Sequence, residues 1–193
     1  MGADFSQNVP DIPETELREL TDSTVFKKHE LKRWYRKFMK RYPNGQMDKD
    51  QFNEAYSKLY TTTINCTNHF SQHIFHSFDR DNKGFISFRE LMLYFSIVSC
   101  GTTQEKLEWA FHVFDLNKTG KITMEDVDHI VNCIGNCTEN GKVYMSNLDV
   151  SEIFVLIDKD ADGYWSVEEF IEGARLYPWL FKKTLQVGGG RNR

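Results

Sequence analysis

The stretch Asp158–Glu169 reads DKDADGYWSVEE and decides the fold of this chain. It places five carboxylates in twelve residues around one glycine, Gly163. Carboxylates this close repel one another, so a folded protein keeps them together only if each reaches bulk water or if they converge on a cation. The spacing of Asp158, Asp160 and Asp162, two residues apart and followed by the glycine, favours the cation.

The spacing matches D-x-[DN]-x-[DN]-G-x5-E, the pattern of an EF-hand calcium loop, at every defined position. Positions 1, 3 and 5 offer carboxylate oxygens, position 7 a backbone carbonyl, and position 12 both oxygens of a glutamate. A solvated acidic loop, the alternative interpretation, would need all these positions to agree by chance. The predicted Ca2+ ligands are Asp158, Asp160, Asp162, Tyr164 and Glu169.

Similar glycines recur at intervals of 36 to 43 residues, which indicates stacked helix-loop-helix units. Two places after each glycine stands an apolar residue, and these residues would face each other where two loops pair through a short strand. We therefore predict an all-α protein of four EF-hands in two paired lobes, with short antiparallel β-bridges between paired loops. The glycines are Gly45, Gly84, Gly120 and Gly163, and the apolar residues are Met47, Ile86, Ile122 and Trp165.

Gly101 marks the expected boundary between the lobes, because a capping box of Thr102 and Glu105 follows it and starts a new helix. We expect an N-terminal arm and the start of the first helix over residues 1–24, and a mobile glycine-rich tail over 181–193. The N-terminal EF-hand pair is expected over 25–100, with loops at 40–51 and 79–90, and the C-terminal pair over 101–180, with loops at 115–126 and 158–169.

The first two loops differ in charge. The first has Lys40 at position 1 and Gln51 at position 12, so it offers no carboxylate where a cation needs one and should be inactive. The second has Lys83 at position 5, where an ammonium cannot act as a ligand. Binding there should be weakened and requires Lys83 to swing out so that water takes its place. The predicted ligands of the second loop are Asp79, Asp81, Phe85 through its carbonyl, and Glu90.

The third loop ends in Asp126 instead of a glutamate. Aspartate is one methylene shorter, so bidentate contact is harder and the loop should favour six-coordinate Mg2+ or weak Ca2+. The chain is thus expected to bind two or three Ca2+ ions, most tightly in the fourth loop, with Mg2+ competing in the third. The ligands of the third loop are Asp115, Asn117, Thr119, Lys121 through its carbonyl, and Asp126.

Composition excludes several classes of function. The 193 residues carry a net charge of −4, so there is no overall basic footprint for nucleic acid. Four cysteines without a CxxC pair, and a start that lacks the regions of a signal peptide, favour a reduced, cytoplasmic protein. No apolar run is long enough to span a bilayer, so we expect any membrane contact to be peripheral.

Two features of the N-terminal region concern membranes. The start MGADFS fits the pattern for N-myristoylation of Gly2. One myristoyl chain anchors a protein only marginally, and the stretch Lys27–Arg41 could add eight Lys and Arg side chains facing anionic lipid. The alternatives are an ordinary disordered start and a solvated helix face, and the sequence leaves both open.

The motifs together resemble those of the neuronal calcium sensor family, over most of the chain. They are MGADFS, WYRKFMKRYPNG with its inactive loop, FRELMLYFSIVSCG, QEKLEWAFHVFDLNKTGKIT and EEFIEGA. The resemblance implies that calcium uncovers a groove for a target helix and can release the myristoyl group to a membrane. The family usually has a Cys-Pro pair where this chain has Tyr42-Pro43. By resemblance, Gly45 and Gly101 are candidate hinges, and the groove residues are Trp34, Tyr35, Phe38, Phe52, Tyr56, Leu59, Phe88, Leu91 and Phe95.

The leading hypothesis is a non-enzymatic calcium sensor that regulates a membrane-associated target, such as a receptor kinase, a guanylyl cyclase or a channel, by binding an amphipathic helix of it. A cytosolic calcium buffer without a groove, and a constitutively anchored regulator resembling guanylyl cyclase activators, are the alternatives. The aromatic stripes could also be plain core. His69, His73 and His76 share a helix face and could suggest zinc, but surface histidines are favoured over an enzyme site. The sequence leaves open whether the protein dimerises.

Overall fold

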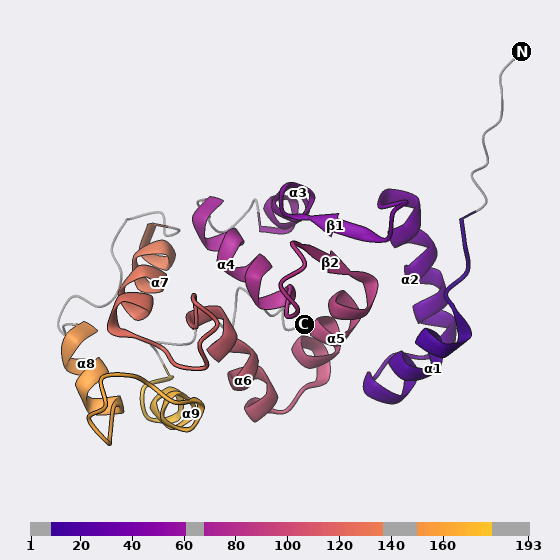
Figure 1. Ribbon diagram of the computed structural model, residues 1–193. Helices are drawn as coiled ribbons and strands as arrows, with labels where there is room; N and C mark the ends of the chain where they lie inside the picture. Colours follow the sequence, from indigo (N-terminus) through magenta and orange to yellow (C-terminus); the bar gives the residue numbers. More distant parts are fainter. Residues whose placement is uncertain (1–8, 61–67, 137–149, 179–193) are drawn as a thin grey trace, which may run out of the picture.

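The computed structural model describes residues 9–60, 68–136 and 150–178. Within these ranges it contains nine helices and a two-stranded sheet (Figure 1). The elements are α1 (Glu14–Ser23), α2 (Lys28–Arg41), β1 (Gln46–Asp48), α3 (Lys49–Tyr60), α4 (Asn68–Phe78), β2 (Phe85–Ser87), α5 (Phe88–Cys100), α6 (Thr103–Phe114), α7 (Met124–Asn136), α8 (Val150–Ile157) and α9 (Val167–Leu176).

The loops pair as predicted. β1 runs antiparallel to β2, and Met47 lies opposite Ile86. In the second half of the chain, Ile122 and Trp165 form an isolated antiparallel bridge, with two backbone N–H···O distances of 3.0 and 2.8 Å. The four apolar residues that stand two places after the loop glycines, at loop position 8, therefore meet their predicted partners. This confirms two pairs of EF-hands.

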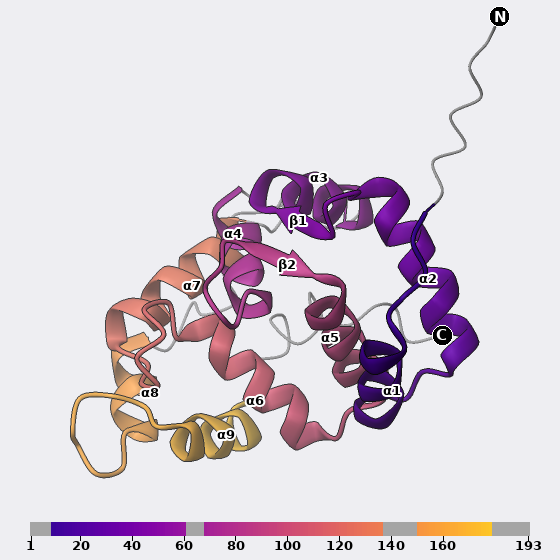
Figure 2. The same cartoon turned by 45° about the vertical axis from the view of Figure 1, so that its right-hand side comes forward.

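The two pairs lie side by side. Helices α1 to α5 form one half and α6 to α9 the other, and α4 packs against both α6 and α7 of the second half (Figures 1 and 2). Gly101 joins the halves at the predicted boundary, where an added Cβ would lie 2.4 Å from the carbonyl oxygen of Ile97. The predicted capping box of Thr102 and Glu105 is confirmed at the start of α6.

Helix α1 lies within the N-terminal segment 1–24 and is separate from α2, the first helix of the first EF-hand. It ends at Ser23, and the chain is extended at Thr24 before α2 starts. The hydroxyls of Ser23 and Thr24 donate to the carbonyls of Glu19 and Leu20, which satisfies acceptors that a helix end leaves open. Helix α1 then packs on α2 and α5 through fully buried apolar side chains, including Leu17.

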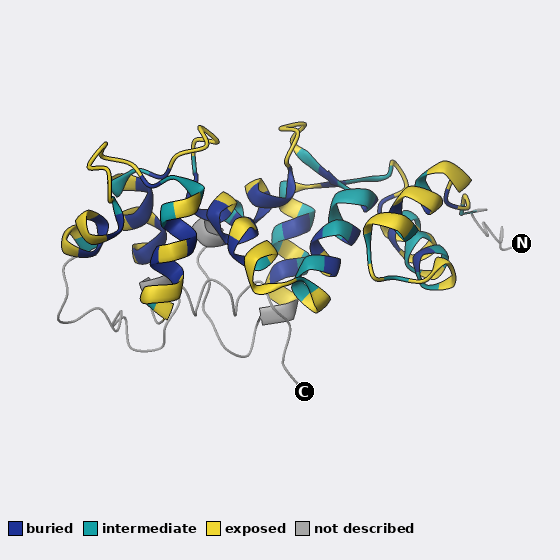
Figure 3. Ribbon diagram, turned by 90° about the horizontal axis from the view of Figure 1, so that it is seen from below, coloured by how far each residue is buried: buried dark blue, intermediate teal, exposed yellow. Residues whose placement is uncertain are grey.

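The core is aromatic in both halves, while the loop tips are exposed and project from one side of the molecule (Figure 3). Trp165 is fully buried next to the fourth loop, stacks on Phe154 at 4.9 Å and donates its indole N–H to the carbonyl of Phe154. The core of this half thus reaches up to its calcium loops. No helix in the described parts of the chain is long and apolar enough to cross a membrane.

Candidate calcium sites

One hydrogen-bond pattern recurs in three of the four loops. The carboxylate at position 1 accepts hydrogen bonds from the backbone N–H groups at positions 5 and 6. In the second loop, Asp79 accepts them from Lys83 and Gly84 at 2.9 Å each. Asp115 repeats the pattern in the third loop at 2.9 and 2.8 Å, and Asp158 in the fourth at 3.2 and 3.0 Å. Each of these loops is therefore wrapped around its first predicted ligand.

The same three loops share an unusual backbone turn. Position 4 has a positive φ of 53° to 57° in each, although none of these residues is glycine, and position 6 is a glycine with positive φ. Left-handed backbone at a non-glycine residue is uncommon and costs free energy. In each loop this turn accompanies the hydrogen bonds from positions 5 and 6 to the position 1 carboxylate, so the three loops share one backbone shape. The position 4 residues are Asn82, Lys118 and Ala161.

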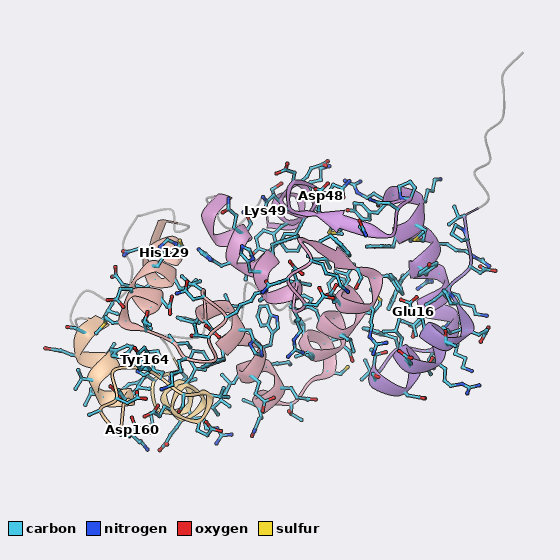
Figure 4. The ribbon with its side chains drawn as sticks, viewed as in Figure 1. Glu16, Asp48, Lys49, His129, Asp160 and Tyr164 are labelled. Carbon is cyan, nitrogen blue, oxygen red and sulfur yellow. The ribbon has the colours of Figure 1, made fainter. Side chains whose placement is uncertain are left out.

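Carboxylate oxygens converge in the second and fourth loops. Oxygens of Asp79, Asp81 and Glu90 lie within 4.8 Å of one another. Oxygens of the position 1, 3 and 5 aspartates of the fourth loop do the same, and Figure 4 labels Asp160 of this set at the outer edge of the molecule. Ligands of one Ca2+ ion lie about 2.3–2.6 Å from it and hence at most about 5 Å apart. Both oxygen sets therefore fit a Ca2+ ion.

In these two loops the position 12 carboxylate is both a predicted ligand and part of the N-terminal cap of the helix that follows. Glu90 Oε2 accepts hydrogen bonds from the backbone N–H and the hydroxyl of Ser87, at 2.8 and 2.6 Å. Glu169 Oε2 does the same with Ser166, at 2.8 Å each, and its Oε1 accepts from the N–H of Lys159. Partial burial pushes the pKa of Glu169 up, but these hydrogen bonds outweigh it, so its pKa lies below the usual value. The carboxylate is thus kept ionised at the start of α9.

The third loop brings its ligands together through shorter side chains. Asp115 and Asp126 are both buried, and the amide of Asn117 lies 3.4 Å from Asp126 Oδ1. The hydroxyl of Thr119 donates to the carbonyl of Lys121, which is the predicted position 7 ligand, at 3.0 Å. Asp126 Oδ2 also accepts from the N–H of Thr123 at 2.9 Å. These contacts pair Asn117 with Asp126 and Thr119 with Lys121, and the loop has fewer carboxylate ligands than the second or fourth loop.

The first loop keeps the shape of an EF-hand loop without carboxylate ligands. Its turn is closed by a backbone hydrogen bond of 2.8 Å from Gly45 N–H to the carbonyl of Tyr42. Asp48 and Gln51 cap α3 reciprocally, each donating its N–H to the other's side chain at 3.0 and 2.8 Å. Pro43 occupies position 4, where its ring excludes the positive φ that the other three loops adopt. The proline is a second reason, beyond charge, why this loop should not bind calcium.

Lys83 lies among the ligands of the second loop. Its ammonium pairs with Asp81 Oδ2 at 2.6 Å, and this hydrogen bond lowers the pKa of Asp81. The side chain therefore holds a predicted ligand, although binding of calcium was expected to require that it swing away. An ion entering this loop has to displace the ammonium from Asp81.

Two lysines of the third loop reach into other loops, and neither contact was expected from the sequence. Lys121 Nζ pairs with Asp162 Oδ2 at 2.8 Å and lies 4.8 Å from the ring centre of Tyr164. Lys118 Nζ donates to the backbone carbonyl of Asp79 and to Asn82 Oδ1 in the second loop. The third loop is therefore linked by charge to both of the other predicted calcium loops.

The predicted groove residues are mostly inside the protein. Phe38 and Phe88 pack against each other at 5.6 Å, and Phe95 is 39% exposed. Trp34, Tyr35 and Leu91 are half-buried, while Phe38, Phe52, Tyr56 and Phe88 are buried. The side chain of Leu59 and the whole of Gly2 lie outside the described residues, so the lipidation site stays a prediction, as does the groove.

The comparisons with known proteins agree with this geometry. Family models described as an EF-hand domain pair match residues 43–96 and 104–175. S-modulin of Aquarana catesbeiana is 34% identical over 164 residues, which cover 81% of this chain and 80% of that protein. The chain belongs to the neuronal calcium sensor family. As a neuronal calcium sensor it is a calcium-binding EF-hand protein, and both of its matched pairs contain loops whose oxygens fit the ion.

Proposed function

We propose that this neuronal calcium sensor changes conformation when Ca2+ binds and thereby regulates a membrane-associated target, such as a receptor kinase, a guanylyl cyclase or a channel. The observation that carries the proposal is the position of the last ligand. Glu90 and Glu169 are each the third residue of a helix, α5 and α9, and Asp126 is the third residue of α7. A position 12 carboxylate that closes on an ion therefore draws its helix with it.

The protein's own residues supply the parts of this movement. The bound ion provides the positive charge on which the carboxylates of each loop converge. The position 1 aspartate is already oriented by the backbone N–H groups of its loop. The helix caps formed by Glu90 and Glu169 keep their carboxylates fixed to α5 and α9. Loop and helix are thus coupled before the ion arrives.

The proposed target is an amphipathic helix, which would bind the predicted groove. Phe88 of α5 contacts Tyr35 at 5.1 Å and Phe38 at 5.6 Å, both on α2. A shift of α5 on binding of calcium in the second loop would separate these rings and expose their apolar surface. The burial of most groove residues fits a closed conformation, from which opening would be driven by calcium.

The proposed membrane contact combines a myristoyl group on Gly2 with the basic helix α2. Within α2, Lys32 pairs with Glu14 at 3.2 Å and Arg36 with Asp11 at 2.8 Å. Lys28, Arg33, Lys37 and Lys40 are exposed on the same helix. Exposed cations next to a lipid chain would add attraction to anionic headgroups. We therefore propose a cytoplasmic protein that associates peripherally with membranes and has no enzymatic activity.

The test is co-sedimentation of the myristoylated protein with vesicles containing phosphatidylserine, with calcium or with magnesium plus chelator. A protein that lacks the lipid and the variant Glu169→Gln serve as controls. Pelleting that requires both calcium and lipid supports the proposal. Equal pelleting in both conditions would indicate a constitutive anchor, with calcium acting only on the groove. Calcium binding without any change in α5 or in pelleting would indicate a buffer and overturn the proposal.

A further inference from the structure

Three side chains with nitrogen or sulfur ligands meet where α4 of the first half packs on α7 of the second. Nε2 of His73 lies 3.0 Å from Nε2 of His129, and the two rings are perpendicular at 4.9 Å. The thiol of Cys133 joins them, so that one ligand atom from each residue lies within 4.8 Å of the others. Figure 4 labels His129 on α7. The cluster contains no carboxylate and lies outside the EF-hand loops.

The helices place these residues without a loop being involved. His129 and Cys133 are four residues apart on α7, so they share one face of that helix. His73 belongs to α4, which packs against α7. The sequence pattern grouped His73 with His69 and His76, but the cluster takes only His73 from α4 and its other two members from a helix 56 or more residues away.

The burial of the three residues is graded. Cys133 is 7% exposed, His73 is half-buried and His129 is exposed. A thiol at the base and an imidazole at the rim leave one side of the cluster open to solvent. An ion can therefore enter from that side and keep a water molecule as a further ligand.

The donor set selects the ion. Imidazole nitrogen and thiolate sulfur are ligands of Zn2+, whereas Ca2+ and Mg2+ prefer oxygen. Zinc binds nitrogen at about 2.0–2.1 Å and sulfur at about 2.3 Å, so ligand atoms of one ion lie roughly 3–4 Å apart. The two imidazole nitrogens already meet this spacing, and the sulfur lies within 4.8 Å of both. We propose that His73, His129 and Cys133 form a Zn2+ site that joins the two halves of the protein.

The site would act on the calcium response, and this part of the inference rests on the proposed function. Helix α4 ends at Phe78, directly before Asp79 of the second loop, and α7 contains Asp126 of the third. An ion that fixes α4 to α7 restrains two helices that calcium would move. By linkage, Zn2+ must then change the affinity for Ca2+ by the same factor by which Ca2+ changes the affinity for Zn2+.

The test uses Co2+ as a spectroscopic probe for Zn2+, on the reduced full-length protein with saturating Ca2+ and Mg2+ in the EF-hand loops. The wild type should bind one Co2+ with a thiolate-to-cobalt absorption band that Zn2+ abolishes. Cys133→Ser should lose the band. His73→Gln and His129→Gln should each lower the affinity for Co2+. Loss of a residue that only supports a ligand costs roughly 10- to 100-fold in metal affinity, and loss of a ligand itself should cost at least as much.

Matched controls are Cys100→Ser, which changes another cysteine, and His76→Gln, three residues from His73 on α4. Both should bind Co2+ like the wild type. A thiolate band that survives Cys133→Ser, or unchanged affinity in both histidine variants, would overturn the site. The two histidine variants change side chains that are at least partly exposed, so they should not impair folding.

A separate calcium titration with and without Zn2+ tests the coupling. The wild type should show a shifted Ca2+ affinity and His129→Gln none. A normal cobalt band with no shift in Ca2+ affinity would uphold the site and refute its link to the calcium response.

Discussion

The ammonium of Lys121, in the third loop, lies 2.8 Å from Oδ2 of Asp162 at position 5 of the fourth. This ion pair lowers the pKa of Asp162 and raises that of Lys121, chiefly through the hydrogen bond between them. A ligand of the fourth loop is therefore held by a cation from its neighbour. Calcium has to compete with that cation for the same oxygen.

Replacing this lysine should tighten binding in the fourth loop. Lys121→Met removes the ammonium but keeps the backbone carbonyl that the third loop uses. Because the pair is exposed, we expect a gain of roughly two- to fivefold in calcium affinity, which shrinks as salt is raised. Calorimetric titration at two salt concentrations measures it.

Lys159→Met is the control for that change. Lys159 belongs to the fourth loop itself, but its ammonium pairs with Glu172, which is not a ligand. An equal gain in both variants would mean that net charge, and not the contact with Asp162, governs the affinity.

The second loop should respond more strongly. Lys83→Asp removes the ammonium that pairs with Asp81 and adds a carboxylate at position 5, so calcium affinity in this loop should rise by at least about tenfold. Lys83→Met, which removes the cation without adding a ligand, should give a smaller gain. Calorimetry on both variants in a Glu169→Gln background isolates the second loop from the fourth. If Lys83→Asp leaves the affinity unchanged, the loop is limited by something other than position 5.

Glu16 should make the stability of the calcium-free protein depend on pH. It lies on α1 and faces the region between α1, α2 and α5 (Figure 4), where burial raises its pKa despite the nearby charge of Arg89. The folded protein then holds the proton of Glu16 more tightly than the unfolded chain does. The free energy of unfolding therefore falls as pH rises from the ordinary pKa of this group through the raised one. Glu16→Gln should therefore stabilise the protein at neutral pH and have no such effect well below the ordinary pKa of glutamate.

The gain should stay below about 1 kcal/mol, because the side chain is half-exposed and partly screened by solvent. Urea unfolding at several pH values measures it. Glu14→Gln on the same helix loses an ion pair with Lys32 and should show no gain at neutral pH. A gain for Glu16→Gln that is the same at all pH values would contradict the electrostatic explanation.

Gly173 allows α9 to pack closely on α8. An added Cβ would lie 2.5 Å from Cδ1 of Ile157 and less than 3 Å from both of its γ carbons. Ile157 is buried and β-branched, so it has little room to move. Gly173→Ala should therefore lower the free energy of unfolding by about 1–3 kcal/mol, although alanine is the better helix former.

Thermal and urea unfolding test that loss. Arg175→Ala, on the exposed side of α9, should stay within about 0.5 kcal/mol of the wild type. The double variant with Ile157→Val should recover part of the loss, and no recovery would mean that the strain lies elsewhere.

The fold could be predicted from the sequence because its signals are local. The alternation of carboxylates around Gly163 and the apolar residue at position 8 recur at similar spacing, so four hands and their pairing followed from pattern alone. The capping box at Thr102 is equally local and marked the boundary between the halves. The helix α1 was harder to separate, because its end depends on two hydroxyls that bond back to the helix.

The contacts between different loops and between the two halves could not be predicted, because they join residues far apart in the chain. Lys121 meets Asp162 across 41 residues, and His73 meets His129 across 56. Lysine at positions 4 and 7 of a loop is compatible with the pattern, and only the folded arrangement shows which carboxylate or carbonyl its ammonium reaches. Pro43 was a local signal for the inactive loop that a comparison of position 4 among the loops would have revealed.

The first loop has a consequence for the steepness of the calcium response. Backbone hydrogen bonds and the cap formed by Asp48 and Gln51 close this loop without an ion, so we expect its shape not to depend on calcium. Its strand β1 pairs with β2, with Met47 opposite Ile86, and we expect this pairing to stay the same when calcium binds. Cooperativity within a pair requires that each loop alter the other upon binding, so the N-terminal pair should titrate with a Hill coefficient of one. Any sharper threshold in the protein must arise from the bridge between Ile122 and Trp165 or from communication between the halves.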